Sequence, residues 1–360
     1  MVQSIFEVLQ NEEYEEIVYG YDKYSGMKAI VAIHNTALGP AFGGTRMMPY
    51  KTEEDALKDV LRLSKAMTYK NAAGGINYGG GKAVIIGDPK VDKNEDLLRA
   101  FGRFIEGLGG RYITGVDVGT DEDDMVIVHQ ETNYNVALPE SYGGGGSTSA
   151  ATAYGLCHGI KAAAEEVFGD SSLKGKKVSI QGVGHIGYVL AKYLIEEGAK
   201  VVACDVNEIN LKKAKDDLNI EIVSPEKIYD QEVDIFSPCA LGGVLNDSTI
   251  PRLKCKLIAG SANNQLADEI KNCRMIEDRG IVFAVDYILS VGGCINNTHQ
   301  FLGYNRERAY GQIYHNITTN IKDVLKTSKE KKILTVEAAR NLAEHRMQMA
   351  VNRKSWYLKK

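Results

Sequence analysis

Three glycines and an aspartate between residues 176 and 205 have the spacing of a dinucleotide-binding site. The apolar segment KKVSIQ leads into Gly182-x-Gly184-x-x-Gly187, and the amphipathic segment YVLAKYLIEEG follows. A second apolar segment, AKVVACD, ends in Asp205, 18 residues after Gly187. This order of strand, glycine turn, helix, strand and acid predicts a pyrophosphate at a helix N-terminus and ribose hydroxyls at the aspartate.

Each of these residues has a physical reason for its type. Gly182 allows the tight turn, Gly184 lets the backbone approach a pyrophosphate, and Gly187 lets the helix pack closely on the sheet. The carboxylate of Asp205 would accept hydrogen bonds from ribose hydroxyls and repel a 2′-phosphate, which favours NAD over NADP. A glycine-rich turn without a ligand is the alternative, and the complete strand–helix–strand context argues against it.

A second glycine run, GGGK, ends at Lys82 and precedes the apolar segment AVIIG. A nucleotide-binding P-loop needs GxxxxGK followed by Ser or Thr, so Ala83 argues against that site. A lysine beside buried backbone is instead a candidate acid or base, because burial disfavours its charged form. Lys70, twelve positions earlier, would bring a second positive charge nearby. A solvated surface charge is the alternative for either lysine taken alone.

The elements that must position these residues alternate between strands and helices. Strands are expected at 28–34, 83–87, 176–181 and 200–205, and helices from Thr52, at 96–108, at 150–168 and over much of the last 50 residues. The turn-rich stretch PESYGGGGSTS (139–149) is the best domain boundary. This pattern predicts an α/β fold of two domains.

Length and composition limit the class of protein. The chain has 360 residues, of which 44% are hydrophobic and 25% charged, and these values exclude a disordered or fibrous protein. The net charge of −4 argues against a nucleic-acid partner, and no apolar run reaches the roughly 18 residues of a membrane span. Six cysteines without a CxxC pair suit free thiols, so we expect a cytoplasmic location. Seven histidines without HxxxH or HxH spacing predict no metal site.

Beyond these patterns, the sequence resembles the glutamate/leucine/phenylalanine/valine dehydrogenase family, and within it the small leucine and phenylalanine branch. The resemblance covers nearly the whole chain. Besides the fingerprint, it rests on LGPAFGGTRMMPY (38–50), RLSKAMTYKNAAGGINYGGGKAVIIGDP (62–89), GRYITGVDVGT (110–120), DIFSPCALGGVLND (234–247), IAGSANNQL (258–266) and GYNRERA (303–309).

The resemblance implies NAD-linked oxidative deamination, in which an L-amino acid and water give a 2-oxo acid and ammonia. Lys70 matches the family lysine that binds the substrate carboxylate, with help from the backbone of Gly43 and Gly44. Lys82 matches the lysine that activates water, and Asp117 matches the acid that exchanges a proton with the substrate nitrogen. A turn aspartate is the alternative for Asp117, and a helix cap is the alternative for Asn263.

The resemblance also implies which residues line the substrate and cofactor sites. The expected substrate positions are Phe42, Gly43, Gly44, Met67, Lys70, Gly115, Cys294 and Asn297. The expected cofactor positions are Thr152, Gly182, Gly184, His185, Ile186, Gly187, Asp205, Cys239, Ala240 and Asn263.

The choice of amino acid depends on few positions. Family glutamate enzymes carry a lysine where Phe42 stands, so Phe42 implies an apolar substrate. Gly115 and ALPESYGG (137–144) resemble the phenylalanine branch, whereas NAAGGINYGGGK and GYNRERA resemble the leucine branch. GGCINN departs from both, because Cys294 and Asn297 stand where aliphatic residues are common. We expect leucine and other branched-chain amino acids as substrates, with phenylalanine as the alternative.

The resemblance assigns a role to each expected domain. Residues 1–138 would bind substrate and form an oligomer interface, 139–150 would be a glycine-rich linker, 151–295 a Rossmann NAD-binding domain and 296–360 a helical C-terminal segment. A homo-oligomer is implied. A catalytically idle NAD-binding regulatory protein is the alternative, and the joint presence of Lys70, Lys82 and Asp117 argues against it.

Overall fold

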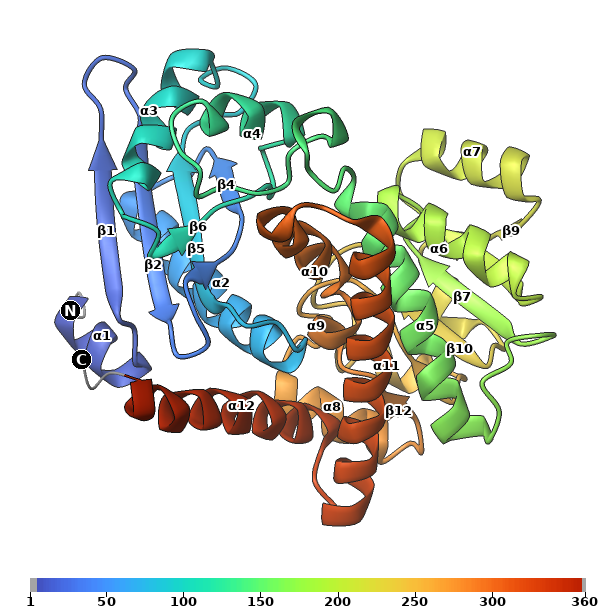
Figure 1. Cartoon of the computed structure of the whole chain (residues 1–360). Coiled ribbons are helices and arrows are strands. Elements are labelled where there is room, and N and C mark those ends of the chain that lie inside the picture. Colours follow the sequence, from blue (N-terminus) through green and yellow to red (C-terminus); the bar gives the residue numbers. More distant parts are fainter. Residues whose placement is uncertain (1–4, 358–360) are drawn as a thin grey trace. The chain divides into compact units, whose positions relative to one another are not determined.

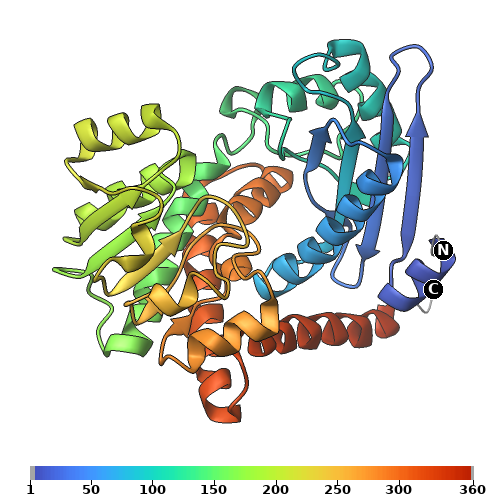
Figure 2. The same ribbon diagram turned by 180° about the vertical axis from the view of Figure 1, so that it is seen from behind.

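The computed structural model describes residues 5–357 and contains two compact units. Unit 1 runs to Gly146 and also includes Asn297–Asn305 and the residues from Ala343, whereas unit 2 comprises Ser147–Asn296 and Arg306–Leu342. Both units combine helices with strands, so the structure has the predicted mixed α/β class (Figures 1 and 2). The predicted C-terminal segment, which starts at residue 296, is divided between the units over the residues that the structure describes, and 358–360 lie outside them.

Unit 1 is built on a mixed sheet. Its elements are α1 (Ile5–Glu12), β1 (Glu16–Tyr21), β2 (Lys28–Asn35), β3 (Ala41–Phe42), β4 (Thr45–Met48), α2 (Glu53–Ala73), β5 (Gly79–Ile86), α3 (Glu95–Glu106), β6 (Tyr112–Ile113), α4 (Glu122–His129) and the 3₁₀ turn Glu140–Tyr142. The strand order is β1-β2-β5-β3-β6, with β4 beside β5. β5 is antiparallel to β2 and parallel to β3 and β4, so it lies at the centre of the sheet.

The two faces of this sheet are covered by different helices. Side chains alternate between the faces along a strand. Val31 and Ile33 of β2 therefore join the core beneath α3 and α4, whereas Ile30 of β2 and Val84 of β5 pack with Val60 of α2. Figure 1 shows α2 on one face of the sheet and α3 and α4 on the other.

Local sequence explains why α2 forms where it does. The helix begins after Thr52, whose Oγ1 accepts a hydrogen bond from the Asp55 N–H at 3.0 Å. Residues recurring about every four positions bury one face of α2 against the sheet. Lys70 lies in the last turn, where the helix dipole favours a positive charge.

β5 begins earlier than the predicted strand at 83–87. The glycine run belongs to the strand, so Lys82 lies inside β5, paired with Ala32 of β2, and not in a loop before it. Two residues from Val84, Lys82 lies on the α2 face of the sheet. Close packing explains the glycines, because a Cβ on Gly80 would lie 2.0 Å from Thr68 Oγ1 of α2.

Unit 2 is a parallel sheet with helices. Its elements are α5 (Thr148–Phe168), β7 (Lys177–Gln181), α6 (His185–Glu196), β8 (Lys200–Cys204), α7 (Glu208–Leu218), β9 (Glu221–Ile222), β10 (Ile235–Pro238), β11 (Leu257–Ile258), α8 (Glu269–Glu277), β12 (Val282–Phe283), α9 (Asp286–Leu289), α10 (Gly292–Thr298), α11 (Arg306–Lys331) and α12 (Thr335–Tyr357), with 3₁₀ turns at Ile228–Asp230 and Ile250–Arg252. A further 3₁₀ turn, His299–Leu302, belongs to unit 1. α10 and α12 each continue into unit 1.

The strand order of unit 2 creates a binding edge. The order is β12-β11-β10-β7-β8-β9, and all neighbours are parallel. The chain winds from β7 out to β9 and then returns to β10 on the other side of β7. The carboxyl ends of β7 and β10 therefore form the topological switch point of a doubly wound sheet, the place where such sheets bind ligands.

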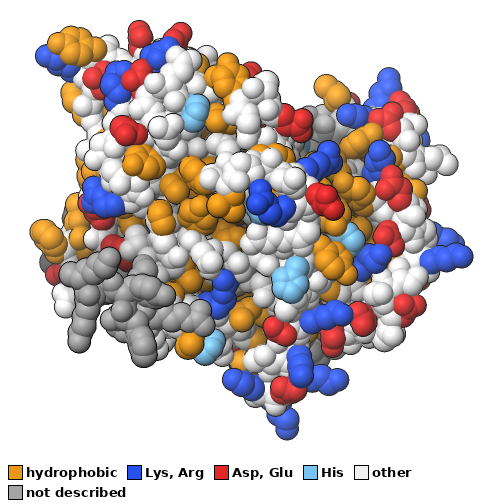
Figure 3. Space-filling model, in the orientation of Figure 1, with side chains coloured by type: hydrophobic (Ala, Val, Ile, Leu, Met, Phe, Trp, Pro, Cys, Tyr) orange, Lys and Arg blue, Asp and Glu red, His pale blue; other side chains and the backbone are white. Residues whose placement is uncertain are grey.

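Neither the described helices nor the charged side chains on the face drawn indicate a membrane span or a strongly charged partner. Within residues 5–357, no helix combines the length and the apolarity that a membrane span requires. On the face in Figure 3, basic and acidic side chains are interspersed, with no large area of one sign.

Candidate active site

Lys82 and Asp117 form an ion pair in unit 1. Lys82 Nζ lies 3.3 Å from Asp117 Oδ2, and the Lys82 residue is only 5% exposed. Asp117 is in the loop after Val116, and this loop is closed by Thr120, whose Oγ1 accepts the Asp117 N–H at 3.0 Å and donates to Thr45 O at 2.8 Å. The fold thus brings together the two residues predicted to be catalytic.

The carboxylate of Asp117 has a second cationic partner, Arg46 of β4. Arg46 Nε donates to Asp117 Oδ2 at 2.8 Å. Burial by itself raises the pKa of a carboxyl group, but the positive charges of Lys82 and Arg46 outweigh it and hold the pKa of Asp117 below its usual range. Asp117 is therefore a carboxylate at neutral pH and can accept a proton from an ammonium group.

Gly43 and Gly44 join β3 to β4 where no side chain fits. A Cβ on Gly43 would lie 2.0 Å from Gly81 O, and a Cβ on Gly44 would lie 2.2 Å from Val116 O. The Gly43 N–H already donates to Ile113 O at 3.2 Å. This amide is therefore engaged inside the sheet, and the substrate contact expected there remains a prediction.

The other expected substrate residues of unit 1 lie on α2, on β3 and after β6. Lys70 and Met67 are half-buried in the last turns of α2. Phe42 is buried and packs edge-on against Tyr78, with ring centroids 5.9 Å apart. A Cβ on Gly115 would lie 3.2 Å from Val136 Cγ2. The neighbours of Phe42 and Gly115 are thus largely apolar, which suits an apolar substrate side chain.

Cys294 and Asn297 lie one helical turn apart on α10, and the boundary between the units falls between them. Cys294 is a half-buried free thiol. Asn297 is buried, and its Oδ1 accepts no hydrogen bond from the described residues. The described contacts do not join either residue to Lys82 or Asp117, so their part in a substrate pocket remains a prediction.

The conformation of the fingerprint loop of unit 2 depends on glycine at two positions. Gly182 has a φ of +95°, and a Cβ on Gly187 would lie 1.9 Å from Gly182 O. By contrast, a Cβ on Gly184 would have nothing within 4 Å. Gly184 is the N-cap of α6 and offers no side chain to the first N–H groups of that helix. These donors and the helix dipole can hold phosphate groups.

Asp205 closes the same loop from the end of β8. Its Oδ2 accepts the Val183 N–H at 2.8 Å, and its Oδ1 accepts the Asn207 N–H at 2.9 Å. The carboxylate therefore ties the glycine loop to the end of β8, a structural role that the sequence did not predict. Asn210 Nδ2 also donates to Oδ2, at 3.5 Å, but Oδ1 can accept a second hydrogen bond, so a ribose hydroxyl can still donate to Asp205.

Four further cofactor positions border the switch point, and a fifth lies on α5. His185 and Ile186 begin α6, and Cys239 and Ala240 follow β10, where the Cys239 N–H donates to Gln181 O at 2.8 Å. Thr152 uses its hydroxyl inside unit 2, because Oγ1 donates to Thr148 O at 2.8 Å and accepts the Gly293 N–H at 3.1 Å. The loop residues thus lie at the binding edge of the sheet.

Asn263 lies in a turn after β11 and begins no helix. The helix that follows, α8, begins at Glu269, and its cap is Asp268, whose side chain accepts the Lys271 N–H at 2.9 Å. The interpretation of Asn263 as a helix cap is therefore wrong, because four further residues separate it from the cap position. A turn at the carboxyl end of β11 is compatible with the predicted cofactor contact.

Arg46 and Asp59 are site residues that sequence reasoning missed. Arg46 joins the two carboxylates, because its Nη1 donates to Asp59 Oδ2 at 3.0 Å while Nε holds Asp117. Arg46 stands inside LGPAFGGTRMMPY, a segment that carries the resemblance, and an arginine within it was the only available signal. No spacing rule links three residues that are 13 and 71 positions apart.

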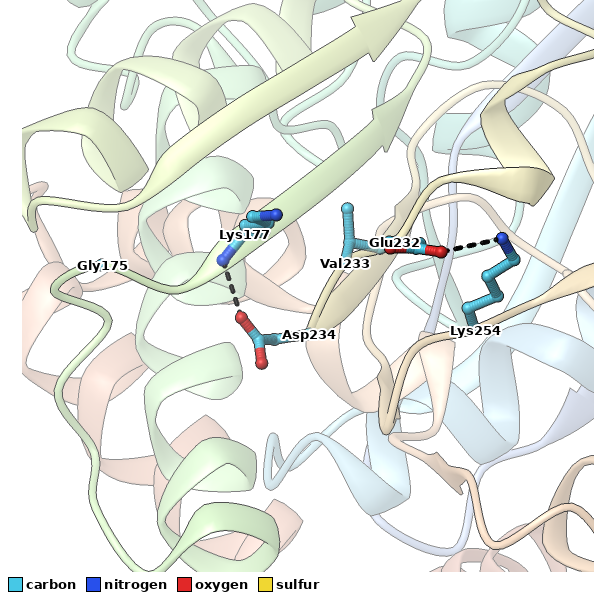
Figure 4. Close-up of a pocket in the computed structure, with 6 residues that line it drawn as sticks. All are labelled: Gly175, Lys177, Glu232, Val233, Asp234 and Lys254. Atoms are coloured by element: carbon cyan, nitrogen blue, oxygen red, sulfur yellow. Dashed lines mark hydrogen bonds and ion pairs between the residues drawn. The ribbon is translucent and has the colours of Figure 1, made fainter.

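A charged hollow lies at the opposite end of β7 from the fingerprint. It is lined by Lys177, the first residue of β7, and by Glu232, Asp234 and Lys254 (Figure 4). The Lys177 N–H donates to Asp234 Oδ2 at 2.8 Å, and Lys254 Nζ lies 3.3 Å from Glu232 Oε1. Lys254 and Glu232 thus pair within the hollow, which is separate from the binding edge. Residues 5–357 contain no cluster of His, Cys, Asp or Glu side chains that could hold a metal ion.

Comparison with known families covers both units. Residues 16–134 match the family described as Glu/Leu/Phe/Val dehydrogenase, dimerisation domain. Residues 143–209 and 205–354 match the family described as Glutamate/Leucine/Phenylalanine/Valine dehydrogenase. Together the two matches span most of the chain.

Individual relatives are similar over their full length. A leucine dehydrogenase of Thermoactinomyces intermedius is 52% identical, with 99% of this chain and 96% of the relative covered. A phenylalanine dehydrogenase of Bacillus thermotolerans is 46% identical, with coverage of 98% and 93%. The crystal structure of an L-tryptophan dehydrogenase from Nostoc punctiforme matches with a TM-score of 0.84 and 42% identity, covering 96% of this chain and 99% of that one.

Proposed function

The chain belongs to the Glu/Leu/Phe/Val dehydrogenase family, and we propose that it oxidises leucine and other branched-chain L-amino acids to 2-oxo acids and ammonia with NAD as hydride acceptor. It is an amino acid dehydrogenase. The observation that carries the proposed chemistry is the buried pair formed by Lys82 and Asp117, a potential base and a carboxylate 3.3 Å apart.

The residues of unit 2 fit a dinucleotide. The bare N-terminus of α6 would hold the pyrophosphate, and the space beside Gly184 leaves room for close approach. Asp205 would accept hydrogen bonds from the adenosine ribose, and its charge would repel a 2′-phosphate, which supports NAD over NADP. NAD, when bound, takes up the hydride that leaves the substrate α-carbon.

The residues of unit 1 would bind the substrate carboxylate and transfer protons. The ammonium of Lys70 would bind the substrate carboxylate. Water must add to the oxidised α-carbon and lose a proton, and the neutral amine of Lys82 would take that proton. Asp117 would exchange a proton with the substrate nitrogen, so that the nitrogen leaves as ammonia.

The substrate preference rests on Phe42 and on the relatives. A buried aromatic ring at position 42 cannot pair with a side-chain carboxylate, which supports an apolar substrate. The 52% identity to a leucine dehydrogenase supports leucine. Phenylalanine is the second candidate, because Gly115 resembles the phenylalanine branch and a phenylalanine dehydrogenase is 46% identical. A methylene in an apolar pocket changes binding by about 1–3 kcal/mol, so the two preferences can overlap.

Two further properties belong to the proposal. A homo-oligomer with unit 1 in the interface is supported by the family description of residues 16–134 as a dimerisation domain. A cytoplasmic location is supported by the free thiols of all six cysteines, which suit a reducing compartment.

The test measures NADH absorbance at 340 nm with a panel of L-amino acids, apolar and polar, using about 1 mM NAD or NADP. We expect the highest kcat/KM with leucine, valine or isoleucine and NAD, and no turnover of D-leucine, the matched control. A higher kcat/KM with glutamate than with any apolar amino acid would contradict the role of Phe42. Equal rates with NADP would contradict the role of Asp205.

A further inference from the structure

Arg46 connects two parts of unit 1 that are distant in sequence. It lies on β4, next to β5 in parallel register, and its side chain is 17% exposed. Its Nε donates to Asp117 Oδ2 at 2.8 Å, and its Nη1 donates to Asp59 Oδ2 at 3.0 Å. The planar guanidinium therefore bridges two carboxylates through two different nitrogens, which fixes its orientation.

Asp59 anchors the far end of this bridge to α2. Besides Arg46, Asp59 Oδ2 accepts a hydrogen bond from the Tyr50 hydroxyl at 2.7 Å. Its second oxygen, Oδ1, accepts one from Arg62 Nη2 at 2.9 Å. With both oxygens occupied, Asp59 cannot rotate without breaking several charge-assisted hydrogen bonds, so it holds Arg46 firmly.

The two oxygens of Asp117 have different surroundings. Arg46 Nε and Lys82 Nζ both reach Oδ2, at 2.8 and 3.3 Å. Among the described residues Oδ1 has no hydrogen-bond or ion-pair partner, while the side chain is 24% exposed. One oxygen is thus occupied by two cations, and the other is open to an incoming molecule.

We propose that Arg46 is a positioning residue that holds Asp117 by Oδ2 and so presents Oδ1 as the oxygen that exchanges a proton with the substrate nitrogen. This inference rests on the proposed function. Its physical basis is the difference between the two cations. Lys82 must lose its proton to act as a base, and its attraction for Asp117 then falls. Arg46 keeps its charge at every relevant pH, so it holds Asp117 in one orientation whether the proton is on Lys82, on Asp117 or on the substrate.

The charged and titratable groups around Asp117 come from several elements. They are Lys82 on β5, Arg46 on β4, Asp59 on α2, Tyr50 after β4 and Tyr112 on β6, whose hydroxyl donates to Gly43 O at 2.6 Å. Arg46 is the permanent positive charge among them. Its removal favours the protonated forms of both Asp117 and Lys82, so both effects reduce activity on the acid side of the pH profile.

The test compares Arg46→Gln and Arg46→Lys with Arg99→Gln. Arg99 is a matched control, because it also joins two carboxylates of unit 1, Glu95 at 2.8 Å and Glu131 at 2.9 Å, without touching Asp117. We expect Arg46→Gln to lower kcat about 10²-fold, to leave the KM for the amino acid within about threefold, and to move the acid limb of kcat/KM to higher pH.

Arg46→Lys separates orientation from charge. It keeps the charge but cannot bridge both carboxylates, so we expect about a tenfold loss of kcat with the acid limb in its original place. Wild-type kcat in Arg46→Lys would overturn the proposal even if Arg46→Gln does not fold. Arg46→Gln that behaves like Arg99→Gln, in an enzyme where Asp117→Asn is inactive, would overturn this inference alone. An unmutated protein without amino acid dehydrogenase activity would instead overturn the proposed function.

Discussion

The proposed site of unit 2 is made by the backbone of one loop, whereas that of unit 1 is made by charged side chains from several elements. In unit 2 the proposed cofactor loop comes from one continuous stretch, residues 182–205, and it would hold phosphates through backbone N–H groups, which glycines leave uncovered. In unit 1 the proposed catalytic cluster joins Arg46, Asp59, Lys82 and Asp117 from two strands, a helix and a loop, and it would work through charged side chains. The comparison teaches that a local motif can specify a ligand cradle, whereas a cluster of charges depends on the sheet that assembles it.

The largest expected effect tests the catalytic half of this comparison. Lys82→Ala should lower kcat by about 10³–10⁴-fold, because it removes the proposed base and one of the two cations on Asp117. NAD binding, measured by fluorescence titration, should stay unchanged because unit 2 is untouched. The exposed Lys90→Ala is the control and should retain full activity. Near-normal kcat in Lys82→Ala would remove the catalytic role.

The second largest expected effect concerns the proposed cofactor loop of unit 2. Gly187→Ala should weaken NAD binding about 10²-fold or prevent folding of unit 2, because its Cβ would lie 1.9 Å from Gly182 O. The control is Gly311→Ala on α11, where a Cβ has no neighbour within 4 Å and should add about 0.5–1 kcal/mol of stability. Isothermal titration with NAD and urea unfolding measure the two quantities. Unchanged NAD affinity in Gly187→Ala would contradict the predicted loop geometry.

A smaller effect tests whether buried titratable groups make unit 1 sensitive to acid. His34 Nδ1 lies 2.9 Å from Thr68 Oγ1, and burial lowers the pKa of His34 from 6.5 to about 4. Between these values the unfolded chain binds more protons than the folded one. The contribution of His34 to the free energy of unfolding should therefore be complete above pH 6.5 and decline as the pH falls towards 4. We expect this histidine to account for a loss of about 2 kcal/mol between pH 7 and pH 5.

Urea unfolding at pH 7 and pH 5 measures this contribution. His34→Gln should reduce the difference between the two pH values, whereas the exposed His315→Gln should leave it as in the wild type. An identical difference in all three proteins would show that His34 is not the group responsible.

The smallest effect returns to unit 2. Asp205→Ala should lower the preference for NAD over NADP about tenfold, because the charge that repels a 2′-phosphate is lost. Some loss of kcat/KM with NAD should accompany it, because Asp205 also accepts the Val183 N–H. Asp216→Ala, an exposed aspartate on α7, is the control. A ratio of kcat/KM values for NAD and NADP that does not change would assign Asp205 a structural role only.

The sequence predicted the positions of elements in unit 2 more accurately than in unit 1. The strand before Gly182, the helix after it and Asp205 at the end of β8 all lie where the fingerprint predicts. In unit 1 pattern reasoning singled out Lys82, and only the family resemblance singled out Asp117. Lys82 was placed before its strand because glycine is usually a poor strand residue, and only the close packing of β5 against α2 makes glycine suitable there. The resemblance also predicted that the Gly43 N–H would be available to the substrate carboxylate, although this N–H donates a hydrogen bond to Ile113 O.

What the sequence alone determined was the α/β class and the glycine cradle, because these follow from short-range spacing, and the resemblance to a family indicated which groups would react. The tertiary structure decided that Arg46 and Asp59 stand beside Asp117 and that both cations reach the same oxygen. The reason is physical. The order of strands in a sheet is set by packing over the whole unit, and no local pattern records which side chains it brings together.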